Sequence, residues 1–302
     1  MLGVSKQALY NREKYLIKEG IETAIVLEKV KYIKQKLPMT GGRKLKYMLE
    51  RRKINVGRDR LFNILRENKL LVRRKRRFAR TTFSNHWLRK HKDIYKNYKV
   101  EKPEQVFVSD ITYIRVKEGF NYLSLVTDAY SKRIMGSRLS KDLTKEGTVA
   151  ALKQAIDSRA FNHSLMHHSD RGFQYCCKDY IDLLESNNIA VSMTQSGSPY
   201  DNAIAERVNG ILKHELGLDK TFEDHEQAIK AVDLAVSRYN KIRPHMSCGY
   251  LTPNQTHKSK QPIKRLWKKK KYRNYNTEIG NNFLESQILI TNPILNNKIE
   301  IK

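Results

Sequence analysis

The sequence predicts a mixed α/β fold in which an all-helical region precedes a five-stranded sheet with helices on both faces. Residues 1–70 place apolar side chains at helical spacing. Residues 105–140 read instead as three short strands, and from residue 144 onward helices alternate with two further strands. Because strands that alternate with helices favour a sheet covered on both sides, we expect one such domain in the middle of the chain.

Net charge divides the chain in the same way. The 302 residues carry a formal net charge of +28. Residues 1–100 hold 29 basic against 8 acidic side chains, residues 258–302 hold 11 against 3, and residues 101–257 hold 19 against 20. A near-neutral body between two strongly basic pieces favours a polyanionic partner, namely nucleic acid, over basic flanks that only aid solubility.

Residues 1–72 are predicted to form a helical, helix-turn-helix-like DNA-binding region. The segments 41–52 and 54–71 read as two short amphipathic helices, and the second has basic residues near its start. Arg58 and Arg60 lie off its apolar face, where a recognition helix contacts DNA. Plain packing helices with a basic surface remain the alternative.

Residues 73–100 are predicted to form a basic linker. Its first part, RRKRRFAR, has no apolar periodicity, so we expect extended backbone that follows DNA phosphates. A solvated run of charge is the alternative. The candidate phosphate contacts are Arg73, Arg74, Arg76 and Arg77.

Residues 101–257 are predicted to form the α/β core, and residues 258–302 a basic tail. The short connections between the first three strands favour an antiparallel meander. The expected strands are 105–116, 120–128, 133–140, 164–170 and 189–193, and the expected helices are 144–159, 175–188, one from about Ala203, and 223–241.

Two aspartates of the predicted core lie at positions that indicate a functional role. Asp110 lies in the middle of the first strand between apolar neighbours, where an ionised side chain is costly unless it is paired or binds a metal. Asp170 follows the fourth strand, at the edge where α/β sheets bind ligands, and Gly172 allows a tight turn there. A structural ion pair for Asp110 and a helix-capping turn for Asp170 are the alternatives.

The segment SPYDNAIAERVNGILKHEL holds three more acids. Its turn residues predict a helix from about Ala203, with Asp201 as its cap. At 100° per residue, Glu206 lies far from the apolar stripe and shares a face with Asn209 and Lys213, whereas Glu215 lies on the opposite side. An acid, an amide and a base on one exposed face suit a metal beside a phosphate backbone, which selects Glu206.

Several blocks of the sequence point to one family. In order they read SDITYI, YLSLVTDAYSKRIMG, HHSDRGFQY, SMTQSGSPYDNAIAERVNGILKHEL, YNKIRPH and LTPNQ, and 35 residues separate Asp170 from Glu206. This pattern resembles the DDE motif of transposases and retroviral integrases, and most closely the OrfB product of bacterial insertion-sequence transposases of the IS-three family. Residues 41–70 resemble the helix-turn-helix of those proteins, and the resemblance covers about residues 30–257.

The resemblance implies a ribonuclease H-like core and DNA strand transfer. It implies that Asp110, Asp170 and Glu206 hold two Mg²⁺ ions, which Mn²⁺ can replace, with Asp110 bridging both. Lys213 would contact the DNA backbone, and His168 and Asn202 would support the site. The implied partners are double-stranded DNA of the terminal repeats and target, further copies of the chain, and a small upstream product, OrfA.

The chain departs from the family at Phe107, where Trp is usual, and at Phe173, where Ser is usual. It also contains no region like OrfA, so we expect it to be the catalytic partner. A catalytically silent DNA-binding regulator is the main rival, and a ribonuclease H or Holliday-junction nuclease is the second. The rival nucleases lack the 35-residue interval and the YNKIRPH block.

The remaining composition excludes other classes. No run of about 18 apolar residues is present, and the start of the chain does not read as a signal peptide, so we expect a cytoplasmic, nucleoid-associated protein that does not enter the membrane. Cys176, Cys177 and Cys248 form no CxxC pair. We therefore expect reduced, structural cysteines and no zinc site.

Overall fold

The computed structural model describes residues 5–72, 87–195 and 202–263, all within one compact unit, Met1–Lys264. The predicted contacts Arg73, Arg74, Arg76 and Arg77, the predicted cap Asp201 and the basic tail from residue 264 onward lie outside the described residues. No described helix is long and apolar enough to cross a membrane.

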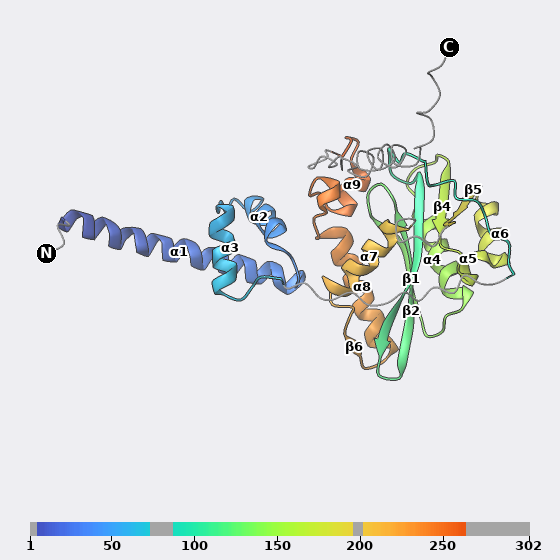
Figure 1. Cartoon of the computed structure of the whole chain (residues 1–302), viewed down its shortest axis with the longest axis horizontal. Coiled ribbons are helices and arrows are strands. Elements are labelled where there is room, and N and C mark those ends of the chain that lie inside the picture. The colour runs from blue at the N-terminus through green and yellow to red at the C-terminus, as the bar shows by residue number, and fades with distance from the viewer. Residues whose placement is uncertain (1–4, 73–86, 196–201, 264–302) are drawn as a thin grey trace, which may run out of the picture. The chain divides into compact units, whose positions relative to one another are not determined.

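Three helices form the N-terminal region: α1 (Lys6–Lys36), α2 (Gly42–Glu50) and α3 (Arg58–Glu67) (Figure 1). The two short helices expected from the apolar spacing are therefore confirmed. Their apolar faces meet the second half of α1 in a core of their own. That core includes Val26, Val30, Ile33, Leu45, Leu49, Leu61, Ile64 and Leu65.

The central sheet has the strand order β3-β2-β1-β4-β5. Strands β1 (Val106–Val116), β2 (Gly119–Asp128) and β3 (Ile134–Ser140) are antiparallel, as the short connections predicted. Strands β4 (Leu165–Ser169) and β5 (Ile189–Met193) run parallel to β1. This mixed sheet is the ribonuclease H-like arrangement, so the predicted fold class is confirmed.

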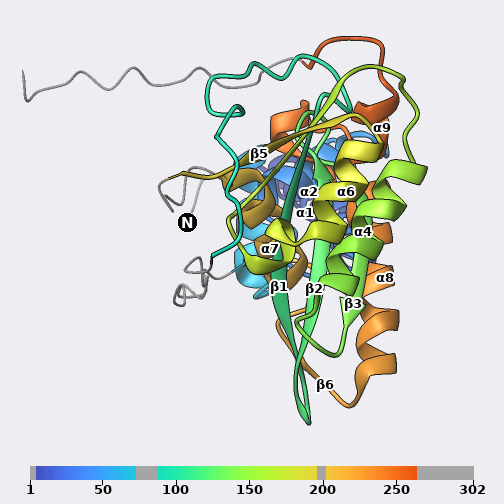
Figure 2. The ribbon, with the colours of Figure 1, turned by 90° about the vertical axis from the view of Figure 1, so that its right-hand side faces the viewer.

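Helices cover both faces of the sheet (Figures 1 and 2). One face packs against α4 (Lys145–Asp157), α5 (Phe173–Cys176) and α6 (Lys178–Ser186). The other packs against α7 (Ala203–His214) and α8 (His225–Lys241). Alternation along β1 explains this division, because successive side chains of a strand point to opposite faces.

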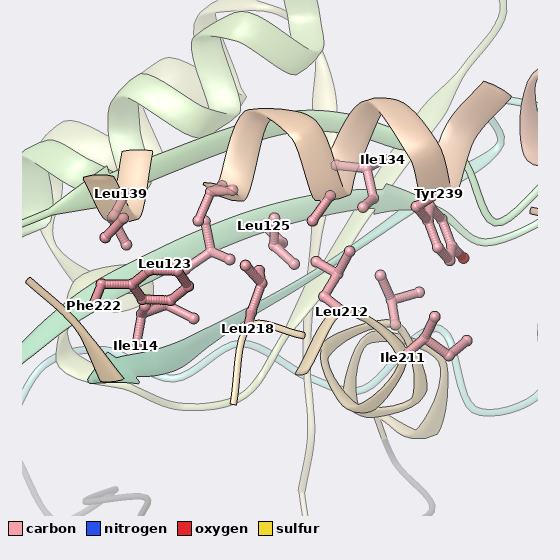
Figure 3. Packing of buried hydrophobic residues seen from close by; sticks show 14 of the residues in the cluster. Ile114, Leu123, Leu125, Ile134, Leu139, Ile211, Leu212, Leu218, Phe222 and Tyr239 are labelled. Carbon is pink, nitrogen blue, oxygen red and sulfur yellow. The ribbon is translucent and has the colours of Figure 1, made fainter. Parts of the chain in front are cut away.

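The core between the sheet and helices α7 and α8 fixes the position of α7. Leu123 and Leu125 of β2 meet Ile211 and Leu212 of α7, and Tyr239 of α8 closes the same cluster (Figure 3). All five side chains are buried. Each fully buried Leu or Ile contributes about 1.5–3 kcal/mol of transfer free energy, so α7 has a well-anchored apolar face.

The structure corrects one element and adds others. The single helix expected over 175–188 is two helices, because Cys177 is extended (φ −69°, ψ 152°). The break lets both Cys176 and Cys177 point into the core, whereas consecutive residues of one helix diverge by about 100°. The sequence did not predict β6 (Thr221–Phe222), which pairs with β1, the short 3₁₀ helix η1 (Met246–Cys248) or α9 (Pro253–Lys258).

One edge of β1 is only partly paired. Toward β4 the strand pairs over Val106–Val108, and toward β6 it pairs at Arg115 and Val116. Between these points no strand among the described ranges pairs with residues 109–114 on that side. We name this stretch the open edge of β1, and Asp110 lies on it.

Candidate active site

Asp110 projects from β1 toward α7. Its Oδ1 accepts a hydrogen bond from the backbone N–H of Ile111 (2.9 Å), and its Oδ2 accepts one from the side-chain amide of Asn209 (2.7 Å). The neighbouring Val108 is buried. The apolar flanks of the strand thus place the carboxylate at the border between core and solvent, with its orientation fixed by two donors.

Asp170 follows the end of β4, which pairs in parallel with β1 as far as Val108 and His168. Asp170 is close enough to Asp110 for its charge to raise the pKa of that carboxyl. Asp170 Oδ1 accepts the backbone N–H of Gly172 (2.9 Å). The alternative in which Asp170 caps the turn before the next helix is therefore correct for its Oδ1 atom. Gly172 has an ordinary φ of −64°, so its backbone conformation does not require glycine. Glycine is favoured there because a Cβ would lie only 3.0 Å from Asp170 Oδ1.

Glu206 lies in the first turn of α7 and is exposed, as its distance from the apolar stripe predicted. The helix begins at Ala203, as predicted, but its cap residue is Asn202 and not the predicted Asp201. The buried Asn202 donates its amide to the backbone carbonyl of Ser109 (2.8 Å). This bond holds the start of α7 against β1, one residue from Asp110.

The three acids share one electrostatic field. Burial first, and then the negative charges of Asp170 and Glu206, raise the pKa of Asp110 to about 7, against the opposing hydrogen bonds from Asn209 and Ile111. The charges of Asp170 and Glu206 thus act on Asp110, although these two residues lie 60 and 96 positions further along the sequence.

This carboxylate cluster suits a hard divalent cation. A bound cation stabilises the ionised form that burial and like charges oppose at Asp110. Among the described residues, no group of three or more His, Cys, Asp or Glu side chains is placed so that it could hold a metal ion by itself. Mg²⁺ does not need such a group, because it is usually held by one or two carboxylates together with waters and substrate phosphates.

Asn209 and Lys213 follow Glu206 along α7. Asn209 is buried and holds Asp110, so the structure places its amide N–H groups toward the acid. Lys213 is half-buried, and burial lowers its pKa although Asp110 and Asp219 act in the opposite direction. Lys213 therefore brings a positive charge within electrostatic range of Asp110.

His168 is fully buried beside the site. Its Nδ1 lies 2.9 Å from Ser192 Oγ, its ring lies 4.8 Å from that of Tyr95, and Asp93 lies 3.9 Å away. The histidine thus joins β4 and β5 to the C-terminal part of the predicted basic linker. It supports the strand that carries Asp170.

A buried polar layer behind β1 was not predicted from the sequence. His167 Nε2 lies 2.7 Å from Ser109 Oγ and 2.9 Å from Tyr180 Oη, and burial lowers its pKa to about 3, so it is neutral. The alternating pattern of β4 was the available signal, since His167 and His168 point to opposite faces. Phe107 is buried on the same side, and Phe173 is half-exposed at the start of α5.

The described arginines of α3 are engaged within the N-terminal region. Arg60 pairs with Glu22 of α1 (2.7 Å), and it also contacts the backbone carbonyl of Glu19. Arg58 pairs with its neighbour Asp59 (2.8 Å). Arg60 thus has a structural partner, whereas Arg58 is the more exposed of the two side chains.

Comparison with known proteins gives a consistent family. Residues 100–199 and 187–253 each match a family described as integrase core domain. The chain is 34% identical over 258 residues to a 31 kDa protein of insertion element IS600 from Shigella sonnei, covering 84% of this chain and 94% of that protein. It is 32% identical over 193 residues to the transposase InsF of insertion sequence IS3A from Escherichia coli K12, covering 63% and 67%.

Among solved structures, the chain resembles the HTLV-2 integrase catalytic core domain in complex with magnesium. The two are 22% identical with a TM-score of 0.42, over 52% of this chain and 97% of that one.

Proposed function

This chain belongs to the IS-three (IS3) family of insertion-sequence transposases and carries an integrase core domain, and from that premise we propose that it cuts DNA at the ends of an element and joins them to a target. The proposal is supported chiefly by the convergence of Asp110, Asp170 and Glu206 from three separate elements into one electrostatic field.

The proposed cofactor is a pair of Mg²⁺ ions, which Mn²⁺ can replace. Asp110 would contact both ions, and Asp170 and Glu206 would hold one each. When bound, such a pair activates the attacking oxygen and stabilises the leaving oxygen of the phosphodiester.

The protein's own groups prepare this chemistry. Asn209 fixes the orientation of the Asp110 carboxylate, and Asn202 holds the start of α7, and with it Glu206, against β1. Lys213 would contact a backbone phosphate of the DNA beside the acids. No described strand pairs with the open edge of β1, and the start of α7 is held against it through Asn202.

The proposed reaction has two steps. Attack by water on a phosphodiester at the end of the element leaves a free 3′-hydroxyl. That hydroxyl then attacks a phosphodiester of the target DNA, which joins the two strands and releases a new 3′-hydroxyl. The substrates are therefore terminal-repeat and target duplexes, and we expect several copies of the chain to assemble on them, with OrfA as a further partner.

A strand-transfer assay tests the proposal. A labelled duplex copied from the DNA that flanks the coding sequence is incubated with target DNA, Mg²⁺, and either wild type, Asp110→Asn, Asp170→Asn or Glu206→Gln. Each substitution should abolish joining while DNA binding persists. Glu226→Gln changes an exposed acid in the first turn of α8 and is the matched control that should keep full activity. Full activity in Glu206→Gln would refute its assignment.

The rival function, a silent DNA-binding regulator, is separated by the same assay. A regulator would bind the duplex without Mg²⁺-dependent cleavage, and the three variants would then match wild type. The presence of all three acids favours the enzyme.

A further inference from the structure

The proposed chemistry leaves one part of the family resemblance without a role. The block YNKIRPH spans Tyr239–His245, at the end of α8 and beyond it, and contributes none of the three acids. In the structure this block and the end of α7 contact the N-terminal helices. The contacts are polar, aromatic and apolar.

The polar contact is an ion pair between Lys44 of α2 and Glu215 at the C-terminal end of α7. Lys44 Nζ lies 2.9 Å from Glu215 Oε2. Arg243 binds the same carboxylate through two nitrogens, with Nε and Nη2 each 2.9 Å from a carboxylate oxygen. The backbone N–H of Met39, just before α2, also donates to the carbonyl of Glu215 (3.4 Å).

This ion pair is only partly accessible to solvent. The Lys44 side chain is 18% exposed and that of Glu215 is 21% exposed. Burial and the positive charge of Arg243 together lower the pKa of Lys44 to about 8, against the opposing effect of Glu215. The contact therefore differs from an exposed surface pair, whose net contribution is close to zero.

Aromatic and apolar contacts surround the ion pair. The ring of Tyr47 on α2 stacks on Tyr250, with centroids 4.9 Å apart and an angle of 20° between the planes. Tyr250 has a φ of +65°, which is rare for a bulky residue and is held only where its surroundings require it. Leu216 and Ile242 pack against the core of the N-terminal helices.

The contact lies on the helix that carries a proposed catalytic acid. Glu215 follows Glu206 by nine residues, about 13 Å along α7 at 1.5 Å per residue. Arg243 joins this end of α7 to the end of α8. A rigid helix therefore connects the docking contact of α2 to the acid at the other end.

We propose that Lys44, Tyr47, Glu215 and Tyr250 form a docking contact that sets the distance from the N-terminal helices to the catalytic acids, and so selects which phosphodiester is cut. This inference rests on the proposed function and on the expectation, drawn from the sequence, that those helices bind DNA. Glu215 and Lys44 are positioning residues, since they act through α7 and touch no reacting atom.

A zero-length carbodiimide cross-link tests the contact without any activity. The reagent joins an amine to a carboxylate only where the two form an ion pair, and the products are mapped by mass spectrometry. Mixing isotope-labelled with unlabelled chains separates links within a chain from links between chains. Lys46 and Glu50, an ion pair inside α2, serve as the internal control. A Lys46–Glu50 link without a Lys44–Glu215 link within the chain overturns the proposal.

Mapping of the cut position tests the consequence. The double variant Lys44→Met/Tyr250→Asn removes the charge and the stack, and Asn accepts the positive φ at position 250. We expect at least about a tenfold loss of preference for the wild-type position, equivalent to about 1.4 kcal/mol, with cuts at neighbouring phosphodiesters. Total Mg²⁺-dependent cleavage of a short duplex that lacks the inner part of the repeat should not change.

Two further variants complete the test. Lys46→Met should cut as wild type does, and Lys44→Arg with Tyr250 intact should retain the single cut position. An unchanged cut position in the double variant overturns the proposal. If wild type cleaves no duplex, the proposed function fails, and the cross-link still decides whether the docking contact exists.

Discussion

Replacing Asp110 by Asn should stabilise the metal-free protein while it abolishes strand transfer. Asp110 is held at the border of the core beside two other carboxylates, and these surroundings raise its pKa from 3.8 to about 7. A neutral amide of the same shape carries no charge to desolvate. The amide of Asn209, whose Oδ1 has no partner among the described residues, can turn to accept a hydrogen bond from the new side chain.

The magnitude follows from the pKa shift. When the pKa of a carboxyl group is higher in the folded than in the unfolded state, the protonated group favours the folded state. This contribution to stability is complete below the unfolded-state pKa and is lost as the pH rises to the folded-state pKa. The shift from 3.8 to about 7 corresponds to an upper limit of about 4 kcal/mol at 1.36 kcal/mol per unit. Because Asp110 is partly open to solvent, we expect Asp110→Asn to gain about 1–3 kcal/mol at pH 8 and roughly a third of that at pH 5.

Urea unfolding at pH 5 and pH 8, with a chelator and then with Mg²⁺, measures this effect. Mg²⁺ should stabilise wild type at pH 8 and stabilise Asp110→Asn much less. Glu226→Gln should follow wild type under every condition. Equal free energies of unfolding for wild type and Asp110→Asn at both pH values would refute the reasoning about burial and like charge.

Three further predictions concern a support of the site, a buried histidine and the packing of the sheet. Asn209→Ala should lower strand transfer about 10- to 100-fold at nearly unchanged Tm, because Asp110 loses its side-chain donor. Burial disfavours the charged form of His257, but hydrogen bonds with two buried carboxylates outweigh this effect and raise its pKa. The resulting stabilisation is complete below pH 6.5 and is lost as the pH rises through the pKa of the folded state. The free energy of unfolding of His257→Gln should not show this loss. Gly136→Ala, whose Cβ would lie 1.9 Å from a carbonyl of α4, should lose about 1–3 kcal/mol of unfolding free energy, while Gly210→Ala, with nothing within 4 Å, should lose none.

The fold could be predicted from the sequence because its determinants are local. Short connections imposed the antiparallel meander, and the turn residues before α7 predicted that it begins at about Ala203, where the structure has it. The break at Cys177 could not be found in this way, since nothing in the local sequence disfavours a helix there. Only the core reveals that two consecutive thiols must both be buried.

For the site, spacing and helical geometry selected the three acids but not their supports. Asn209 was expected to face DNA, yet α7 is rotated so that this residue is buried and donates to Asp110. A single helical wheel cannot distinguish these positions, because Asn209 lies at the border between the apolar stripe and the exposed face. Glu215 was expected to face away from the metal site, and the structure adds that it is the shared partner of Lys44 and Arg243.

The parallel pairing of β1 with β4 also governs when the chain can become active during its synthesis. Asp110 and Asp170 meet only after about 60 intervening residues have formed a hairpin, a third strand and a helix, and contacts between such distant residues form slowly. Glu206 requires still more chain, up to the end of α7 at His214. A nascent or truncated polypeptide that stops before this point carries the basic N-terminal region but lacks Glu206 or the helix that holds it. Under the proposed function, such an incomplete product would not join DNA strands.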